Sequence, residues 1–591
     1  MALAAACAWR PGCGQVYWPA SGPEFCAVPA LLNVRPGTTC TEAGVASAQC
    51  EQPVASLAAQ RGETETAQLL LRWDADLDNH TGALRYVAVD VVGLPPAIDC
   101  TVYQVGYVNT QHTARYYGSG GGWRPDPLIP LQAGGTFDVP PGVSQALLLS
   151  CDVAASAAPG HYNATVRLRC DGGRCGGEWL QAGLEIEVWD VALPPLGESR
   201  IGTAWSGNWF AENFDRYYGA GYWDRSSRVW YDTMIRHRTP PDYIYRSSPR
   251  PIEDYEYLAS KGTRWFALMD VTNLQAPESA RSERGSAPAR PVHYGAPRAA
   301  CGKNFSEAYV SLLIAELAPT VRALRERGLL DRAYVYGFDE LPPECEPQVR
   351  QLFGATKRAF PDLRTAAVLD WSPMPVDLPV DIWILLYHQF NATDAAPWVR
   401  AGKEQWHYHC IEPSPSMFLN GFIERPLTQT RLLFWLAALN QLRHGAPTGW
   451  LYYNMVEWRG CNSTRCGGAH RDKVMERLAP DGYARTAFTD FPPANFIWRG
   501  LYDDLFANGD GEYLWPCPGG PCTTLRLAAV RDGLEDWELF LRLGEAAVPL
   551  IQELVRGPAD WEADPARLER LRRKAAGLLL ARDGGGAATY V

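Results

Sequence analysis

Residues 334–343 read Tyr334-Val335-Tyr336-Gly337-Phe338-Asp339-Glu340-Leu341-Pro342-Pro343, and this segment is the clearest indication of the fold. It is an apolar strand that ends in two carboxylates and is then stopped by two prolines, which cannot donate to a sheet ladder. Short apolar strands of this kind recur after residue 200, separated by longer and partly helical stretches. Because alternating strands and helices are typical of parallel β/α units, this region is predicted to form a (β/α)8 barrel.

The predicted barrel domain spans residues 200–522. Its eight strands are expected at approximately Ile201 to Trp205, Tyr243 to Tyr245, Trp265 to Met269, Ala333 to Phe338, Thr365 to Leu369, Ile382 to Tyr387, Gln405 to Tyr408 and Trp450 to Tyr453. Residues 308–330 carry leucine and valine at helical spacing, as an outer barrel helix does. Since the active site of such a barrel lies at the carboxyl ends of its strands, Asp339 and Glu340 are expected at the mouth.

The regions on either side have different patterns. Residues 1–195 are predicted to form an antiparallel β-sandwich, because from residue 64 onward short strands are broken by Gly, Pro and Asn without helical periods between them. These strands are Thr66 to Trp73, Arg85 to Val92, Cys100 to Val108, Ala146 to Cys151, Tyr162 to Cys170 and Leu184 to Val188. Residues 523–591 are predicted to form a helical extension that packs on the barrel and contains few strands. The fold class expected is therefore multidomain.

Composition limits the possible partners. A chain of 591 residues is expected to fold as two or three domains. Its net charge is -11, and acids and bases are interleaved without a basic stripe, so no nucleic-acid partner is expected. No apolar run reaches the roughly 18 residues that span a bilayer, so no membrane insertion is expected. The oligomeric state does not follow from the sequence.

The cysteines and glycosylation sequons favour an extracellular, secretory or lysosomal-like compartment. Three close pairs among the 16 cysteines are candidates for disulfides: Cys170/Cys175, Cys461/Cys466 and Cys517/Cys522. Zinc is the competing interpretation, but the sequence contains no C-x2-C pair, which a zinc site would normally use. N-x-S/T sequons begin at Asn79, Asn163, Asn304, Asn391 and Asn462. Residues 1–9 make a poor signal peptide, because their apolar run is short and no positive charge precedes it.

Two adjacent carboxylates suggest a particular kind of glycoside hydrolysis. Side chains of neighbouring residues leave an extended strand on different sides, from Cα atoms about 3.8 Å apart. Asp339 and Glu340 are therefore poorly placed to act as acid and direct nucleophile on one sugar carbon. Instead, Glu340 is expected to be the acid/base. Asp339 is expected to accept a hydrogen bond from the N–H of a 2-acetamido group on the substrate, and thereby to orient the carbonyl of that group as the nucleophile. The alternative is that both acids are solvated or cap the next helix.

Several motifs resemble those of glycoside hydrolase family 123, whose C-terminal signature is the domain of unknown function 4091. They cover roughly residues 150 to 545 and comprise Y-G-F-D-E at 336–340, D-I-W at 381–383, R-L-L-F-W at 431–435, G-W-L-Y-Y at 449–453, L-R-L at 525–527, R-D-G-L-E-D-W-E at 531–538, P-G-H-Y-N-A-T at 159–165 and W-D-V-A-L-P at 189–194. The resemblance implies a retaining, exo-acting β-N-acetylgalactosaminidase with substrate-assisted catalysis by Asp339 and Glu340. It implies no metal or organic cofactor, and a glycan or glycoconjugate as the substrate.

Other residues near predicted strand ends are candidates for sugar binding, since aromatic faces stack on sugars and polar groups bind their hydroxyls. They are Trp205, Asp270, Tyr387, His388, Trp406, Asn454 and Trp458. The alternative for many of them is ordinary barrel packing. His407 and His409 lie two residues apart on one strand, so they are expected to line the barrel mouth, with metal binding as the lesser alternative. Charged residues of the family motif are expected to buttress the barrel through salt bridges: Arg526, Arg531, Asp532 and Asp536.

Two alternative functions remain open at this point. One is a glycosidase that acts on sugars without an acetamido group and takes its nucleophile from Asp270 or Glu457. The other is a non-catalytic glycan-binding or extracellular structural protein, because a fold by itself does not guarantee activity. The insertion at residues 276–298 would favour the second alternative if it blocked the mouth.

Overall fold

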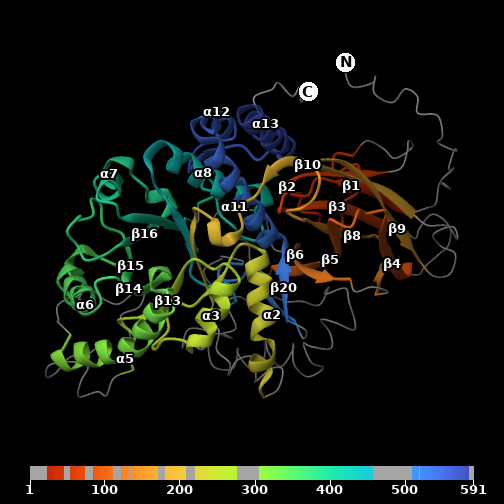
Figure 1. The fold of residues 1–591 in the computed structure, drawn as a ribbon. Helices are drawn as coiled ribbons and strands as arrows, with labels where there is room; N and C mark the ends of the chain where they lie inside the picture. Colours follow the sequence, from red (N-terminus) through yellow and green to blue (C-terminus); the bar gives the residue numbers. More distant parts are fainter. Residues whose placement is uncertain are drawn as a thin grey trace.

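The structure is a computed structural model that describes residues 23–45, 53–73, 84–110, 122–131, 135–170, 180–207, 220–275, 305–413, 415–456, 509–517 and 520–584. These residues form two N-terminal sheets, an eight-stranded barrel sheet and a group of C-terminal helices (Figure 1). The expected fold class is confirmed.

The barrel consists of eight parallel strands in the order β12-β11-β18-β17-β16-β15-β14-β13. They are β11 (Gly202–Ser206), β12 (Pro241–Asp242), β13 (Phe266–Asp270), β14 (Ala333–Leu341), β15 (Arg364–Leu369), β16 (Ile382–Leu386), β17 (Glu404–Tyr408) and β18 (Gly449–Tyr452). Seven of them overlap the predicted strands, and β12 lies just before the predicted Tyr243 to Tyr245.

The barrel is nearly closed, since β12 and β13 stand at the two ends of the sheet without a ladder between them. The Asp242 carboxylate bridges this gap, because Ala267 N donates to its two oxygens at 3.0 and 3.1 Å. Asp270 N also donates to Arg246 O at 2.8 Å. The buried Asp242 side chain and this backbone bond thus replace the eighth strand pair, β12 with β13, that would close the barrel.

Helices cover the outside of the barrel (Figure 1). They are α2 (Tyr222–Arg236), α3 (Ile252–Ser260), α5 (Glu307–Glu326), α6 (Glu346–Ala359), α7 (Ala392–Arg400) and α8 (Leu427–His444). The helix predicted over residues 308–330 is α5; Ser306 caps it by accepting a hydrogen bond from Tyr309 N, and its buried leucines face the barrel. A separate inner cluster along the barrel axis combines aliphatic residues with the aromatic side chains of Tyr334, Tyr336, Trp406 and Tyr408.

The two N-terminal sheets contain seven and five strands, in the orders β1-β3-β8-β5-β6-β20-β19 and β2-β10-β9-β4-β7. Their strands are β1 (Glu24–Val28), β2 (Val54–Arg61), β3 (Thr64–Trp73), β4 (Leu84–Val92), β5 (Ile98–Thr110), β6 (Gly122–Pro130), β7 (Thr136–Val139), β8 (Val143–Val153), β9 (Gly160–Arg169) and β10 (Leu180–Ala192). The pairs are antiparallel except β2 with β10, which is parallel. Leu69 and Leu71 face the opposite sheet, whereas Leu70 faces the helices of the barrel side.

The seven-stranded sheet continues with a segment that follows the barrel in sequence. The hairpin of β19 (Trp515–Cys517) and β20 (Gly520–Thr524) joins this sheet through β6, although the sequence placed most of it in the barrel region. Helix α11 (Leu525–Leu543) starts at the next residue, where Thr524 caps it by accepting from Leu527 N at 2.9 Å. The chain therefore returns to the sandwich before it packs α11 against α8.

The C-terminal extension contains α12 (Val548–Gln552), a short hairpin of β21 (Val555–Gly557) and β22 (Asp560–Trp561), and α13 (Pro565–Gly584). Helix α13 contacts both α11 and strand β10 of the sandwich. Within the described residues, no helix is both long and apolar enough to cross a membrane.

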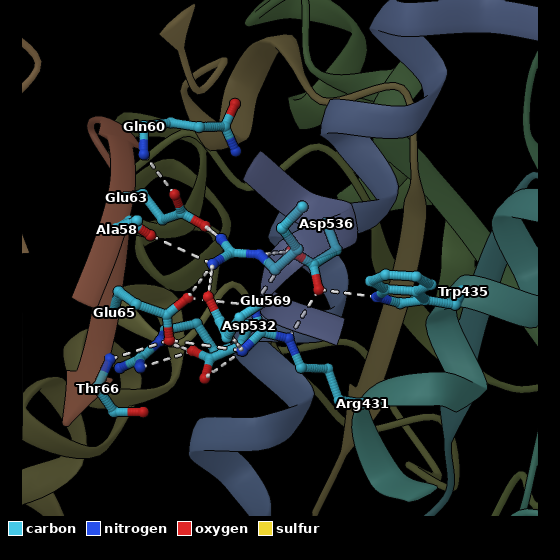
Figure 2. A network of polar contacts seen from close by, with 12 residues as sticks. Ala58, Gln60, Glu63, Glu65, Thr66, Arg431, Trp435, Asp532, Asp536 and Glu569 are labelled. Carbon is cyan, nitrogen blue, oxygen red and sulfur yellow. Dashed lines mark hydrogen bonds and ion pairs between the residues drawn. The ribbon is translucent and has the colours of Figure 1, made fainter. Parts of the chain in front are cut away.

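A buried ionic network joins the sandwich to α8, α11 and α13 (Figure 2). Arg572 contacts Glu63 and Asp536 at 2.5 Å each, and Glu65 at 2.6 Å. Arg431 contacts Asp536 at 2.7 Å and Glu65 at 3.1 Å. Because a buried charge is costly without a partner, these pairs hold the sandwich and the helices α8, α11 and α13 in one arrangement.

The four charged residues of the family motif have the structural use that the sequence predicted. Arg531 pairs with Asp532 at 2.7 Å and Asp536 belongs to the network of Figure 2. Arg526 pairs with Asp126 of β6 at 2.7 Å.

Disulfides are present, whereas Cys175, the predicted partner of Cys170, lies outside the described residues. Cys26 bonds Cys40, and Cys100 on β5 bonds Cys151 on the neighbouring β8. Cys170, Cys345 and Cys522 are also disulfide-bonded. The predicted pair Cys461/Cys466 lies outside the described residues.

Candidate active site

The end of β14 has an unusual backbone. Phe338 and Glu340 have φ values of 61° and 52°, in the left-handed region that side chains other than glycine rarely adopt. The pairing of β14 with β15 shifts register on both sides of Asp339. Each such residue costs about 1–3 kcal/mol and persists only where its surroundings fix it, which is common at functional sites. Phe338 is fixed by the Phe353 ring, with ring centroids 5.2 Å apart.

This backbone places Asp339 and Glu340 on the same side of the strand. Phe338 and Leu341 pack in the outer core beneath the helices, whereas the two carboxylates bond tyrosines of the inner cluster. The expectation that the two side chains leave on different sides is therefore wrong, because it assumed an extended strand. Both acids lie at the mouth, at the carboxyl end of β14, as the sequence predicted.

Asp339 is held by two tyrosine hydroxyls. Tyr336 donates to Oδ1 at 2.7 Å, and Tyr245 donates to Oδ2 at 3.2 Å. Burial raises the pKa of Asp339, and these two hydrogen bonds oppose that rise because they stabilise the carboxylate. Each carboxylate oxygen keeps a lone pair, so a substrate N–H or O–H can still bind there.

Glu340 is poised to hold or release a proton near neutral pH. Burial, followed by the charge of Asp339, raises the pKa of Glu340 to about 7. The Tyr408 hydroxyl donates to Oε1 at 2.6 Å and opposes this rise. A carboxylic acid with such a pKa suits general acid/base catalysis.

Further carboxylates surround this pair. Asp370 and Asp510 both raise the pKa of Glu340 by their charge. Asp270 lies at the end of β13, where burial raises its own pKa to about 7. Its Oδ1 accepts hydrogen bonds from Thr272 N at 2.8 Å and from Thr272 Oγ1 at 2.7 Å. Asp270 was predicted from the sequence, but Asp370 and Asp510 were not.

Three predicted sugar-binding aromatics are buried in packing. Trp205 packs against Phe434 and Tyr452, and Trp406 lies in the inner cluster, both fully buried. Tyr387 stacks with Trp450, and its hydroxyl donates to Leu419 O at 2.6 Å. The packing alternative describes these three residues.

The remaining candidates differ in their surroundings. The His388 ring is half-buried beside Phe418, and burial lowers its pKa. Asn454 lies two residues past the end of β18 and is buried, and its Oδ1 accepts a hydrogen bond from Val456 N at 3.4 Å. Trp458 lies outside the described residues, as do Glu457 and the 276–298 insertion.

His407 of β17 and His409, just after this strand, point away from the mouth. Inner-cluster residues Trp406 and Tyr408 alternate with His407 and His409, whose rings contact Trp450 on the outer face. The expectation that these histidines line the mouth is therefore wrong, since the opposite face of the strand points inward. His409 bonds Trp450 Nε1 and the Tyr513 hydroxyl at 3.2 and 3.0 Å. No group of three metal-binding side chains is found in the part of the chain that the structure describes.

Two mouth residues show what the sequence pattern missed. Tyr408 ends a predicted strand with alternating faces, so its inward direction could have been derived from that alternation. Asp510 lies in a Gly-Asp-Gly sequence far along the chain from any barrel strand, and nothing local connects it with Glu340.

Comparisons with known proteins identify a family model and solved structures that this chain resembles. Residues 298–543 match the family model described as glycoside hydrolase 123, catalytic domain. A solved family 123 glycoside hydrolase from Clostridium perfringens is similar with a TM-score of 0.62 and 11% identity, covering 95% of this chain and 98% of that chain. A Bacteroides ovatus GH5 xyloglucanase matches with a TM-score of 0.25 and 8% identity, over 81% of this chain and 98% of that one. No curated protein sequence matches.

The matched region begins before β14 and ends with α11, so it contains the Asp339-Glu340 pair and the buried charges of the motif. The resemblance seen in the sequence is thereby confirmed: residues 298–543 match the catalytic-domain model of glycoside hydrolase 123, and the protein is a glycoside hydrolase.

Proposed function

We propose that this enzyme removes terminal β-linked N-acetylhexosamine, with N-acetylgalactosamine favoured, by a retaining and substrate-assisted mechanism. The observation that carries the proposal is the adjacent Asp339 and Glu340, which two left-handed residues turn into the same space. The similar Clostridium perfringens enzyme is described as hydrolysing glycolipid glycans. A glycoconjugate is accordingly the substrate class proposed here.

Glu340 acts as the acid and then as the base. In the first step its proton goes to the glycosidic oxygen, while the bond from C1 to that oxygen breaks. The carbonyl oxygen of the 2-acetamido group attacks C1 and forms an oxazolinium ion. In the second step Glu340 takes a proton from water as the water oxygen bonds C1, and the acetamido carbonyl leaves. Two inversions at C1 retain the β configuration.

Asp339 orients the acetamido group. Its carboxylate accepts a hydrogen bond from the amide N–H, which turns the carbonyl oxygen toward C1 and stabilises the positive charge that develops on the ring. The Tyr336 and Tyr245 hydroxyls restrict the carboxylate to one position, so little reorganisation is needed in the transition state.

A glycosidase on sugars without an acetamido group is the second candidate. The position of Asp270 favours this candidate. Asp270 is a buried carboxylate, and the charge of Asp339 contributes to the rise of its pKa, so it lies near the Asp339-Glu340 pair. In that mechanism Asp270 would attack C1 directly. The non-catalytic alternative is dropped, because the chain carries a glycoside hydrolase catalytic domain.

Hydrolysis of aryl β-glycosides of GalNAc, GlcNAc, galactose and glucose tests the proposal, with wild type, Glu340→Gln, Asp339→Asn and Asp270→Asn. We expect release from the acetamido sugars, with loss of roughly a hundredfold or more in kcat when Glu340 or Asp339 is changed. A thiazoline mimic of the oxazolinium ion should inhibit tightly. Turnover only of galactosides or glucosides, abolished by Asp270→Asn, would sink the substrate-assisted mechanism in favour of the second candidate.

We also propose an extracellular or secretory, lysosomal-like location. Disulfides support it, because such bonds persist in oxidising compartments. Of the five sequons, Asn163 and Asn391 lie in the described residues and both are exposed. Expression in a secreting eukaryotic cell should give a protein whose mass falls on treatment with an N-glycan-removing enzyme, and Asn391→Gln should lower that mass shift. An unmodified protein recovered only from the cytosol would contradict the location.

A further inference from the structure

A buried ion pair connects the sandwich to the mouth of the barrel. Asp126 on β6 of the sandwich receives two hydrogen bonds from Arg526, from Nε at 2.7 Å and from Nη2 at 3.0 Å. Trp515 Nε1 donates to the same carboxylate at 2.9 Å. Neither charged side chain is appreciably exposed. Such a fork-like pair fixes direction as well as distance.

Arg526 in turn holds the segment that follows the barrel strands. Its Nη1 donates to Gly509 O at 2.7 Å and to Gly421 O at 3.1 Å, and its Nη2 donates to Glu512 O. Gly509 and Glu512 flank Asp510 in the chain. Gly509 has a φ of 86°, and a Cβ there would lie 2.6 Å from Arg526 Nη1, so this close approach requires glycine.

Asp510 connects this segment to the ends of two barrel strands. Its Oδ2 accepts from the Tyr453 hydroxyl at 3.0 Å and its Oδ1 from the Tyr452 hydroxyl at 3.4 Å, both at the end of β18. The Ile411 amide, just past β17, also bonds its carboxylate. Three residues along, the Tyr513 hydroxyl lies 3.0 Å from His409 Nε2.

Strand β17 is also the strand that reaches Glu340. Tyr408 donates to Glu340 Oε1, and the segment bonds His409 and Ile411 directly after it. Asp510 is close enough for its charge to act on Glu340. The chain of contacts thus runs from Asp126 through Arg526 to Asp510 and on to the proposed acid.

We propose that Asp510 is a positioning residue for Glu340, and that the sandwich takes part in catalysis by holding Asp510 in place through the Asp126–Arg526 pair. This inference rests on the proposed role of Glu340, but not on the identity of the sugar. It explains why the chain returns to the sandwich sheet before α11 begins.

The electrostatic consequence has a definite sign. The charged and titratable groups that face Glu340 are Asp339 on its own strand, Asp370 after β15, Tyr408 on β17 and Asp510. Those that face Asp510 are Tyr452 at the end of β18, the next residue Tyr453, Cys410 and Tyr513. The Arg526 guanidinium bonds the carbonyls of Gly509 and Glu512 on either side of Asp510. Burial raises the pKa of Asp510 itself to about 7, so Asp510 and Glu340 ionise over the same pH range. Asn at position 510 removes the negative charge that Asp510 carries in this range, so the pKa of Glu340 should fall.

The test compares Asp510→Asn and Asp126→Asn with Glu65→Gln. Glu65 is a matched control, because it too is a buried sandwich carboxylate paired with arginines, Arg431 and Arg572, but belongs to the network of Figure 2. The titration of Glu340 is followed by carbon NMR of glutamate-labelled protein, with its signal assigned from Glu340→Gln. The pH profile of kcat/KM on whichever aryl glycoside the wild type cleaves is the second measurement.

Asp510→Asn should shift the Glu340 midpoint down by about half a pH unit or more and lower kcat roughly tenfold. Asp126→Asn should also lower the Glu340 midpoint and kcat. The double variant Asp126→Asn/Asp510→Asn should be no more impaired than Asp510→Asn alone, since both substitutions act on Glu340 through Asp510. Glu65→Gln should lower Tm without moving the Glu340 midpoint.

The inference is overturned if Asp126→Asn and Glu65→Gln both lower Tm while Glu340 titrates as in wild type. If Asp126→Asn does not fold, Gly509→Ala tests the same contact, because its Cβ would displace Arg526 while leaving the charge of Asp126. Failure of the proposed sugar specificity would appear as an inactive wild type on acetamido glycosides, whereas the NMR titration still decides this inference.

Discussion

The hydroxyl of Tyr408 donates a hydrogen bond of 2.6 Å to Glu340 Oε1, which joins β17 to the end of β14 although β15 and β16 lie between them. The bond stabilises the ionised carboxylate, whereas burial and Asp339 favour the protonated acid. The proton affinity of Glu340 therefore depends on a contact made across the barrel mouth.

Replacing Tyr408 with Phe should raise the pKa of Glu340. A general acid works when protonated, so activity is present below its pKa and is lost as the pH rises through that value, about 7 in the wild type. In the variant this loss should move to higher pH, and kcat should fall several-fold because the carboxyl group is less well positioned. Tyr334→Phe is a control, since it removes a hydroxyl bonded to Asp242 within the barrel. A basic limb that moves down instead would contradict the assignment.

Replacing Tyr245 with Phe should weaken substrate-assisted catalysis. Tyr245 is one of two hydroxyls that fix Asp339, so its loss allows the carboxylate to rotate away from the acetamido N–H. We expect about a tenfold loss of kcat and weaker inhibition by the thiazoline. Tyr257→Phe removes a similar bond to an aspartate, Asp232, and should leave both values unchanged. Equal effects of the two variants would refute a specific role for Tyr245.

The turn at the end of β14 depends on Gly337. A Cβ at this position would lie 2.7 Å from Val271 Cγ2 and 3.5 Å from Asp270 Oδ1. Gly337→Ala should therefore lower Tm by several degrees and kcat by more than tenfold, because the displaced backbone carries Asp339 and Glu340.

Adding Val271→Ala to Gly337→Ala should restore part of both losses, since it removes the methyl group in the way. Val271→Ala alone provides the reference for its own cavity, which costs about 1 kcal/mol or more. If the double variant is simply the sum of the two single losses, the close contact is not the cause.

Stability should fall as the pH rises above about 5. In the folded protein, burial raises the pKa of Glu63 to about 8. The folded state then binds more protons than the unfolded state between the ordinary glutamate range and that value, so the free energy of unfolding decreases across this window. Asp270, Asp510 and Asp532 act in the same direction, since the pKa of each is raised to about 7.

Thermal unfolding followed from pH 4.5 to 8.5 checks this expectation. Glu63→Gln should give a shallower fall of Tm above pH 5 than the wild type, because glutamine binds no proton in either state. The difference between the two proteins isolates Glu63, because the buried His237, His407 and His409, whose pKa values burial lowers, act in the opposite direction in both. Equal slopes of Tm against pH in the wild type and in Glu63→Gln would show that Glu63 is ionised in the folded protein. Higher stability at mildly acidic pH would also support the proposed secretory, lysosomal-like location.

The parts of the fold that follow from periodicity could be predicted from the sequence. Strands such as β14 and the helix α5 are encoded in runs of apolar residues whose spacing matches their burial. The displaced β12 is only two residues long, so its pattern is too short to locate. The parallel pairing of β2 with β10 was also beyond reach, because each strand's pattern fits either direction.

The sequence by itself determined the barrel, the sandwich, the place of Asp339 and Glu340 at a strand end, and the structural use of the charged motif on α11. The first three depend on residues that are close in the chain, whose spacing determines which side of an element becomes buried. The fourth follows because a buried charge needs a partner, although the partners themselves, such as Asp126 and Arg431, lie far away in the chain. Tertiary structure alone decided that both acids share one side, because packing around Phe338 holds a backbone that local preference disfavours. It also decided which aromatics are core, and it brought Asp510 beside Glu340 through Asp126 and Arg526, since contacts between distant segments form only when the whole chain is packed.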